Sequence, residues 1–375
     1  MEKIIFGITS LTLGGAERVL VDIVNKLVEK FDITIFTIYS KGELETELDS
    51  RIHLESLYDK KYTELSKMQK ILIPLSVLFN RKKIFKKYVD LEGCVAQISF
   101  LEGPITRIFS TKTKKAVNKI AWIHNDISKV FGKGVKAELK RRFDRSIYER
   151  YNNLIFVSID NLDKFNKVYD DIALPHEKVI HNYINADRIL ELSKDKSDYV
   201  NIFNSKETNI IQISRLTKQK AIERLIDVHA KLIKEGITHH IYIIGDGPLR
   251  AKLQKKIEEN NVQKTFTLLG AKKNPYPYVK DADAFSLFSN FEGYPMVVEE
   301  AKILNKFIAV TNTASREVLI DYPYSSLIVE NSEEGIEEAI KYIVQNKEKI
   351  SKENLNYVYE NDKIIDKIVR VIKNK

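Results

Sequence analysis

Residues 289–301, Ser-Asn-Phe-Glu-Gly-Tyr-Pro-Met-Val-Val-Glu-Glu-Ala, form the most informative stretch of this chain. In it a glycine–proline turn leads into a helical run, and the carboxylates of Glu292 and Glu300 lie on either side of that turn. Gly293 permits a tight turn, and Pro295 suits the first position of a helix. The stretch therefore predicts a loop that opens a helix and carries two acidic side chains, an arrangement typical of a binding site.

The first turn of this predicted helix offers backbone amides to a ligand. The N–H groups of residues 296–298 have no acceptor within the helix, and a helix start carries about half a positive charge, so the turn suits an anion. Glu300 lies about one turn below Met296, and Glu299 lies about 100° around the helix as a natural control. A solvated loop–helix junction is the alternative explanation for a glutamate pair at this spacing.

A second loop carries two cations. Residues 209–213 predict a strand, and the apolar residues among 222–233 recur at helical spacing. Arg215 and Lys220 lie in the loop between them. Fixed cations beside a helix start suit a diphosphate, whose charge grows when it departs as a leaving group. Two ordinary surface cations are the alternative.

A third loop, near the start of the chain, is rich in glycine. Residues 3–9 predict a buried strand, and residues 16–27 carry the apolar stripe of an amphipathic helix. Gly14 and Gly15 lie at the turn between them, where a backbone without side chains lets a ligand approach closely. The pair lacks the spacing of a dinucleotide-binding fingerprint and is by itself a weak signal.

These three loops, in this order, resemble the motifs of one enzyme family. Glu292 and Glu300 resemble the Glu-x7-Glu motif of the retaining, nucleotide-sugar-dependent glycosyltransferases of family four, also called group 1. Residues 215–220 resemble the family's Arg-Leu-x3-Lys element, and residues 14–17 its N-terminal Gly-Gly-Ala-Glu loop. Ser214 departs from the pattern, because many members have Gly there. Other similar segments, 157–158, 178–182 and 244–250, extend the resemblance over nearly the whole chain.

The resemblance implies an α/β protein of the GT-B fold, with two Rossmann-like parallel-sheet domains that face each other across a cleft. It implies an N-terminal acceptor-binding domain (1–185), a C-terminal nucleotide-sugar-binding domain (186–355), and a final helix (356–375) that packs back on the first domain. The implied enzyme is a retaining, metal-independent hexosyl- or N-acetylhexosaminyltransferase without a cofactor. Its expected donor is a UDP-sugar, and its expected acceptor is a lipid-diphosphate-linked glycan of bacterial cell-surface polysaccharide synthesis.

Residue roles follow from the same resemblance. Arg215 and Lys220 would neutralise the departing diphosphate, Glu292 would fix sugar hydroxyls, and Glu300 would bind the ribose. His124 follows a predicted strand where the family has a histidine near the donor sugar; a structural histidine is the alternative. No covalent nucleophile stands out, which agrees with the front-face mechanism proposed for the family. The remaining expected donor-binding positions are Gly14, Gly15, Gly245, Tyr294, Pro295, Met296 and Val297.

A metal site is not expected. Asp281 and Asp283 are spaced like the metal-binding Asp-x-Asp of the other large glycosyltransferase fold, but they immediately precede a predicted strand. The histidines have no metal-site spacing, and His229 lies on an apolar helical stripe that predicts a core position.

Length and composition agree with two domains. The chain has 375 residues, of which 43% are hydrophobic, and single cores stop growing near roughly 250–300 residues. Its one cysteine, Cys94, excludes an intrachain disulfide and favours a reducing compartment. The first residues lack the basic n-region and cleavage site of a signal peptide, and no apolar run approaches the roughly 20 residues that cross a bilayer. We therefore expect a cytoplasmic protein whose membrane contact, where it exists, is peripheral on the inner face of the cell membrane.

Apolar runs alternate with helical patterns in both halves of the chain, which predicts two parallel sheets covered by helices. A linker is expected at about 183–200, and the last helix at roughly 352–374. The predicted strands are 4–8, 33–38, 95–98, 120–123 and 154–157 in the first half, and 210–213, 240–244, 265–269, 284–287 and 307–310 in the second.

Positive charge is concentrated in the first half. Counted as Lys and Arg against Asp and Glu, residues 51–150 carry +13 of a chain whose net charge is +9. Residues 65–89 contain seven cations, no acid and an apolar stretch interrupted by Pro74, which resembles a segment that binds an anionic membrane surface. A solvated face is the alternative. Nucleic acid is not expected as a partner, because no nucleic-acid-binding motif accompanies the charge.

Two further functions remain open on this fold. One is a non-catalytic subunit that activates another glycosyltransferase, which loss of a motif residue would favour. The other is a nucleotide-sugar epimerase, which needs no acceptor.

Overall fold

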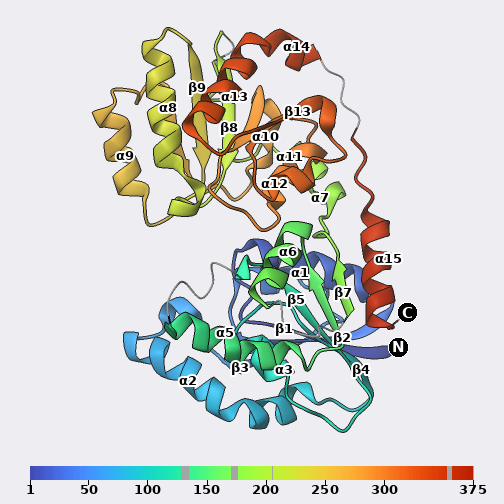
Figure 1. Ribbon diagram of the computed structural model, residues 1–375. Helices are drawn as coiled ribbons and strands as arrows, with labels where there is room; N and C mark the ends of the chain where they lie inside the picture. Colours follow the sequence, from blue (N-terminus) through green and yellow to red (C-terminus); the bar gives the residue numbers. More distant parts are fainter. Residues whose placement is uncertain (128–134, 170–175, 205, 353–356, 375) are drawn as a thin grey trace. The chain divides into compact units, whose positions relative to one another are not determined.

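The computed structural model describes residues 1–127, 135–169, 176–204, 206–352 and 357–374 (Figure 1). The chain divides into two compact units. Unit 1 comprises residues 1–184 together with 360–375, and unit 2 comprises residues 185–359. In each unit helices cover a parallel β-sheet (Figure 1).

Unit 1 contains a seven-stranded sheet with the order β3-β2-β1-β4-β5-β6-β7, and every pairing is parallel. Its central strands read as continuous apolar runs because helices bury both faces. Ile5 of β1 belongs to the core that contains α3 side chains, whereas its neighbours Ile4 and Phe6 point to the opposite face. The strands are β1 Glu2–Ile8, β2 Phe31–Tyr39, β3 His53–Tyr58, β4 Cys94–Ser99, β5 Asn118–Ile123, β6 Asn153–Phe156 and β7 His176–Val179.

The helices of unit 1 form two packed groups. Helix α2 contacts α3, which contacts α5, whereas α1 contacts α15. Asn118 at the start of β5 fixes the end of α15, because its side-chain amide donates to the carbonyl of Val371 at 2.8 Å. The helices are α1 Gly15–Leu27, α2 Lys67–Ile84 with the π-helical turn Phe85–Val89, α3 Pro104–Phe109, α5 Val135–Tyr148, α6 Ile159–Val168 and α15 Asn361–Ile372.

Unit 2 contains a six-stranded parallel sheet with the order β10-β9-β8-β11-β12-β13. Its strands are β8 Thr208–Ile213, β9 His239–Ile244, β10 Phe266–Gly270, β11 Ala284–Leu287, β12 Phe307–Thr311 and β13 Ser326–Val329. Its helices are α7 Ala186–Leu192, α8 Ile222–Lys234, α9 Arg250–Glu259, α10 Tyr276–Asp281, α11 Met296–Ile303, α12 Ser315–Val318, α13 Glu333–Gln345 and α14 Lys347–Lys352.

All ten strands predicted from apolar runs are confirmed, and the structure adds β3, β7 and β13. The boundary between the two units, at residues 184 and 185, falls within the expected linker, which also contains α7. Two helical predictions are wrong in detail, because the last helix begins at Asn361 instead of 352 and α2 continues through Pro74. A proline removes one backbone donor, and α2 continues without it at this exposed position.

Candidate active site

The strand order of unit 2 indicates the edge of its sheet at which a ligand is expected to bind. Successive connections lead from β8 to β9 and β10 on one side, and the chain then returns to β11 on the other side of β8. Ligands of open α/β sheets bind beyond the carboxyl ends of the strands at such a switch point. The loops there follow β8 and β11, and they carry Arg215, Lys220 and Glu292. The structure thus brings these three predicted residues to one edge of one sheet.

Lys220 and Glu292 form a buried ion pair. The Lys220 Nζ lies 2.6 Å from Glu292 Oε1, and the side chains are only 13% and 6% exposed. An ammonium carries three N–H donors, so Lys220 can bind this carboxylate and a further anion together. Among the residues that the structure describes, the second oxygen, Oε2, has only a long contact of 3.5 Å with the Gln219 amide nitrogen. Glu292 therefore keeps acceptor capacity for a ligand hydroxyl.

Hydrogen bonds between the two loops hold this pair in place. The Asn290 N–H donates to the carbonyl of Gln219 at 2.8 Å, and its side-chain amide donates to the carbonyl of Lys218 at 2.9 Å. Gln219 in turn donates to the carbonyl of Phe291 at 3.0 Å. Asn331 donates to the Asn290 carbonyl at 3.0 Å. Sequence reasoning missed Gln219 and Asn290, because their role depends on contacts between distant loops.

Arg215 differs from Lys220 because its side chain is exposed, and it has no ion-pair partner among the residues that the structure describes. The backbone of its loop packs closely against Gly245, which has φ +141°. A Cβ at Gly245 would lie 2.0 Å from the Ser214 carbonyl oxygen. One at Gly247 would lie 2.6 Å from the oxygen of Leu216. The predicted donor-binding position Gly245 thus sets the backbone that carries Arg215.

The start of α11 differs from the sequence prediction by one residue. Pro295 is the residue before the helix and not its first residue, and the Val298 N–H donates to the Pro295 carbonyl at 3.0 Å. Val298 is therefore not available to an anion. The N–H groups of Met296 and Val297 find no acceptor among the described residues. These two amides remain the candidates for ligand binding at this helix start.

Glu299 and Glu300 are not equivalent neighbours. Glu300 is half-buried, whereas Glu299 is 2% exposed and accepts hydrogen bonds from the Tyr357 hydroxyl at 2.9 Å and the Tyr294 hydroxyl at 3.1 Å. Its other partner is Lys302, at 3.1 Å. Burial raises the pKa of Glu299, although Lys302 opposes the shift. Glu299 thus belongs to an internal network that the sequence did not predict, together with the Tyr294 side chain. The use of Glu299 as a control for nucleotide binding stays a prediction.

Unit 1 has its own switch point between β1 and β4, whose connections lead to opposite sides. Gly14 and Gly15 follow β1 and start α1. Neither has a positive φ, and a Cβ on Gly15 would meet nothing within 4 Å. The fold itself does not require glycine at residue 15. Open space beside the backbone is consistent with the predicted ligand approach.

His124 immediately follows β5 and is held by Glu102. The N–H groups of His124 and Asn125 donate to Glu102 Oε1 at 2.6 and 2.8 Å. The imidazole packs 4.7 Å from the Phe100 ring, and burial lowers its pKa to about 3. Its Nε2 is buried without a hydrogen-bond partner in the described part of the chain. His124 is therefore a neutral imidazole, and Glu102 is a supporting carboxylate that the sequence motifs did not identify.

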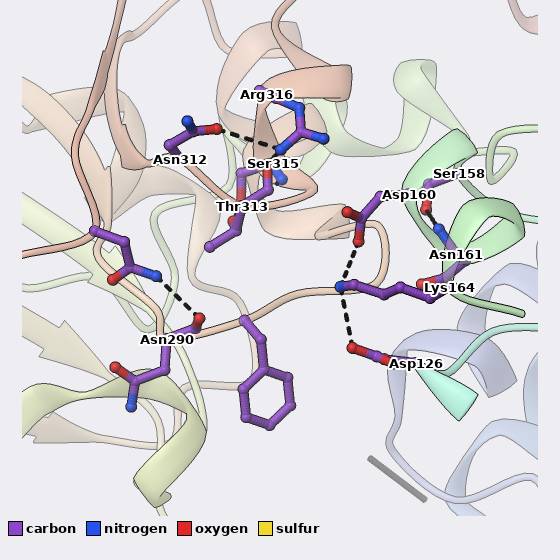
Figure 2. A network of polar contacts seen from close by, with 12 residues as sticks. Asp126, Ser158, Asp160, Asn161, Lys164, Asn290, Asn312, Thr313, Ser315 and Arg316 are labelled. Carbon is purple, nitrogen blue, oxygen red and sulfur yellow. Dashed lines mark hydrogen bonds and ion pairs between the residues drawn. The ribbon is translucent and has the colours of Figure 1, made fainter. Parts of the chain in front are cut away.

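Two further polar groups lie at the carboxyl edges of the sheets (Figure 2). In unit 1, Lys164 Nζ lies 2.6 Å from Asp160 and 3.0 Å from Asp126. Burial opposes the ammonium form, but the two carboxylates raise the pKa of Lys164. In unit 2, Arg316 donates to the Asn312 side chain at 3.3 Å after β12. Each group was missed because its residues come from separate loops or carry no motif.

Asp281 and Asp283 serve structural contacts at the other edge of the unit 2 sheet, before β11. Asp281 pairs with Lys196 at 3.0 Å, and Asp283 accepts from the Asn209 N–H at 2.7 Å. Within the described ranges, no three His, Cys, Asp or Glu side chains are grouped as metal ligands. His229 is fully buried, as its helical pattern predicts, and contacts His239 at 2.8 Å.

No helix among the described residues is both long and apolar enough to cross a membrane.

Comparison with solved structures shows the fold. Anabaena HepE, solved in complex with UDP and glucose, is similar over 100% of both chains, with a TM-score of 0.72 and 14% identity. Two parallel-sheet units of this kind form the GT-B fold, and together with the family match reported next they indicate a nucleotide-sugar-dependent glycosyltransferase.

Residues 193–361 match the model of the family "Glycosyl transferases group 1". The chain is 28% identical to an uncharacterized glycosyltransferase of Methanocaldococcus jannaschii over 80% of this chain and 75% of the relative. It is 24% identical to a Campylobacter jejuni enzyme over 91% of this chain and 90% of the relative. That enzyme is named N-acetylgalactosamine-N,N'-diacetylbacillosaminyl-diphospho-undecaprenol 4-alpha-N-acetylgalactosaminyltransferase.

Proposed function

We propose that this glycosyltransferase moves a hexosyl or N-acetylhexosaminyl group from a UDP-sugar to a lipid-diphosphate-linked glycan, with retention of anomeric configuration. The observation that carries the proposal is the cluster of Arg215, Lys220 and Glu292 at the switch point of unit 2. It combines two cations for a diphosphate with a carboxylate for sugar hydroxyls. The resemblance to HepE, whose structure contains UDP and glucose, supports the choice of donor, and the Campylobacter relative's name supports the acceptor class.

The proposed chemistry is electrostatic. The bond between the anomeric carbon and the diphosphate oxygen breaks, and the acceptor oxygen bonds to that carbon on the same face. The acceptor's proton passes to the departing diphosphate oxygen. Negative charge grows on the diphosphate, where Lys220, Arg215 and the amides of Met296 and Val297 are suited to stabilise it. Glu292 holds the sugar, and Glu300 accepts hydrogen bonds from the ribose.

The remaining assignments rest on family resemblance. Unit 1 would present the acceptor, with His124, Gly14 and Gly15 contributing to contacts with the donor sugar and phosphate. Gly245, Tyr294 and Pro295 would act through the backbone conformation of the donor-binding loops. The reaction would need neither a metal ion nor a cofactor.

The acceptor's lipid makes a membrane-binding surface part of the proposal. Helix α2 exposes an apolar stripe of Met68, Ile71, Leu72, Leu75 and Phe79, of which Phe79 is 83% exposed. These positions follow helical spacing and share one face. Seven cations and no acid lie within residues 65–89. An apolar stripe flanked by cations suits the interface of an anionic membrane.

A donor screen tests the function. UDP-, GDP- and dTDP-sugars are compared by thermal shift, since a ligand that binds the folded state raises its stability. The UDP-sugar that shifts the transition is then incubated with and without a lipid-diphosphate glycan. Transfer only with acceptor is the expected result. Release of an epimerised sugar without acceptor identifies an epimerase, and donor binding without turnover favours a non-catalytic partner subunit.

A further inference from the structure

A pocket of about 560 Å³ opens in unit 1 at the end of α2. Three elements that are distant in sequence form its walls: the end of α2 with its π-helical turn, the segment that precedes β5, and Arg150 before β6. A neighbouring pocket of about 220 Å³ shares Lys112 and Arg150 with it. The lining residues of the larger pocket are Arg81, Lys82, Phe85, Lys86, Asp90, Thr111, Lys112 and Arg150.

The pocket has a strong excess of positive charge. Five cations and one carboxylate line it. None of the five cations forms an ion pair with another described residue. The carboxylate is already engaged, because Asp90 Oδ1 accepts from Thr113 at 3.0 Å and lies 3.5 Å from Lys115. Convergence of like charges is unfavourable unless an anion lies among them.

A buried lysine lies beside this group. Lys119 is 6% exposed, lines the smaller pocket and has its Nζ 4.7 Å from the centre of the Phe85 ring. Its ammonium donates to the carbonyls of Phe109 and Thr111. Burial lowers the pKa of Lys119 to about 8. The hydrogen bonds of Lys119 thus hold the segment that carries Lys112 in place at the wall of the pocket.

The pocket is distinct from the edge that carries His124. Asp90, Lys112 and Arg150 precede β4, β5 and β6, so they lie at the amino ends of these parallel strands. His124 follows β5 at the carboxyl end. A six-residue strand is about 20 Å long, which separates the two edges by roughly that distance. The pocket therefore does not belong to the candidate active site.

The pocket is continuous with the apolar stripe of α2. Phe79, the last exposed apolar residue of the stripe, lies three positions before Lys82, which lines the pocket, so the two side chains share one face of the helix. A free phosphate has no apolar group that could contact this stripe. A phospholipid supplies both a phosphate for the cations and acyl chains for the stripe.

We propose that this pocket binds the headgroup phosphate of an anionic phospholipid while the stripe of α2 enters the membrane interface. The inference rests on the proposed membrane docking of residues 65–89 and not on the proposed sugar transfer. A discrete headgroup site would orient unit 1 on the membrane, which a diffuse positive surface does not do.

Matched variants separate a pocket from diffuse charge. Lys112→Gln removes a pocket cation, and Lys114→Gln removes an exposed cation of the same segment that lines neither pocket. On α2 and its π-helical extension, Lys82→Gln/Lys86→Gln is compared with Lys83→Gln/Lys87→Gln. The paired variants change the net charge equally. Full-length protein is sedimented with vesicles of phosphatidylglycerol and of phosphatidylcholine, and donor binding is followed by UDP thermal shift.

Wild type should sediment with phosphatidylglycerol and not with phosphatidylcholine. Lys112→Gln and the 82/86 variant should lose affinity at least fivefold, and each control less than twofold, with UDP binding unchanged in all. Equal losses of vesicle affinity in variants and controls would overturn the proposed headgroup site and indicate binding through a diffuse positive surface. Absence of sedimentation in wild type would overturn membrane docking without touching donor binding. A thermal shift by glycerol 3-phosphate alone, abolished by Lys112→Gln, would overturn the lipid as ligand in favour of a soluble phosphate.

Discussion

Replacing Lys220 with methionine removes the charge that neutralises a buried carboxylate. Glu292 is 5% exposed, and its Oε1 lies 2.6 Å from the Lys220 Nζ. Removal of one partner of a buried ion pair costs about 3–5 kcal/mol, because the other charge stays buried without compensation. In a unit of about 150–250 residues, 1 kcal/mol shifts Tm by about 2–4 °C, so we expect a loss on the order of 10 °C.

Two companion variants isolate the pair. Adding Glu292→Gln to Lys220→Met removes both charges and should recover most of the lost stability, with a coupling free energy of about 2–3 kcal/mol. Lys252→Met is the control, because Lys252 and Glu223 are also 2.6 Å apart but 62% and 31% exposed. An exposed pair contributes about 0–1 kcal/mol. The control should therefore melt within about 3 °C of wild type.

The assay is differential scanning fluorimetry of the full chain, following the transition that UDP raises, together with kcat. Every variant of the pair should lose turnover about a hundredfold or more, including the double variant that regains its stability. The reasoning fails if Lys220→Met melts with wild type or if the double variant is less stable than Lys220→Met. Near-normal kcat in folded Lys220→Met would refute the phosphate role alone.

Arg215→Ala should lower kcat about a hundredfold at unchanged Tm, since this cation is exposed and unpaired among the described residues; a folded variant with normal kcat would contradict this. Glu300→Gln should raise donor Kd about 10- to 100-fold, for a charge-assisted bond of about 1.5–3 kcal/mol, whereas Glu299→Gln should lower Tm instead. Weaker donor binding in Glu299→Gln but not in Glu300→Gln would show that the motif assignment is off by one residue. Turnover should persist in EDTA, and loss that manganese restores would reject the metal-free mechanism. Lowering the pH from 7 to 5 should lower Tm. Burial lowers the pKa of His229 to about 2 and of His239 to about 4, so both stay neutral when folded and take up protons near 6.5 on unfolding. Replacing both with Gln should reduce this slope without abolishing it, because burial also lowers the pKa of His124 and of His240; an unchanged slope would assign it to other groups.

The sequence predicted strands where burial on both faces produces continuous apolar runs. The three strands it missed, β3, β7 and β13, are edge strands of their sheets. Their residues are largely half-buried or exposed, so polar side chains interrupt the apolar pattern. The central strands of a sheet can therefore be predicted from one sequence, whereas edge strands are much harder to predict.

The site was predictable residue by residue but not as a set of contacts. The motifs located Lys220 and Glu292, yet their ion pair joins loops 72 residues apart, and no local pattern encodes that contact. Helical geometry placed Glu299 on a separate face from Glu300, but the partners that bury it include Tyr357, 58 residues away. Similarly, the charges around residues 81–86 were visible in the sequence. Their convergence with Lys112 and Arg150 depends on the topology of the sheet.

Helix α15 follows the whole of unit 2 in sequence and yet completes unit 1. Its side chains Ile365, Ile368 and Val371 are buried, and its last turn is bonded to Asn118. During synthesis, unit 1 therefore lacks its final helix until residues 185–360 have been made. This delay is roughly 10–35 s at about 5–20 residues per second. Unit 2 can finish folding first, although unit 1 emerges first. A nascent chain released before residue 361 would carry a complete unit 2 and a unit 1 with an uncovered apolar surface, which makes the fragment a natural substrate for chaperones and proteases.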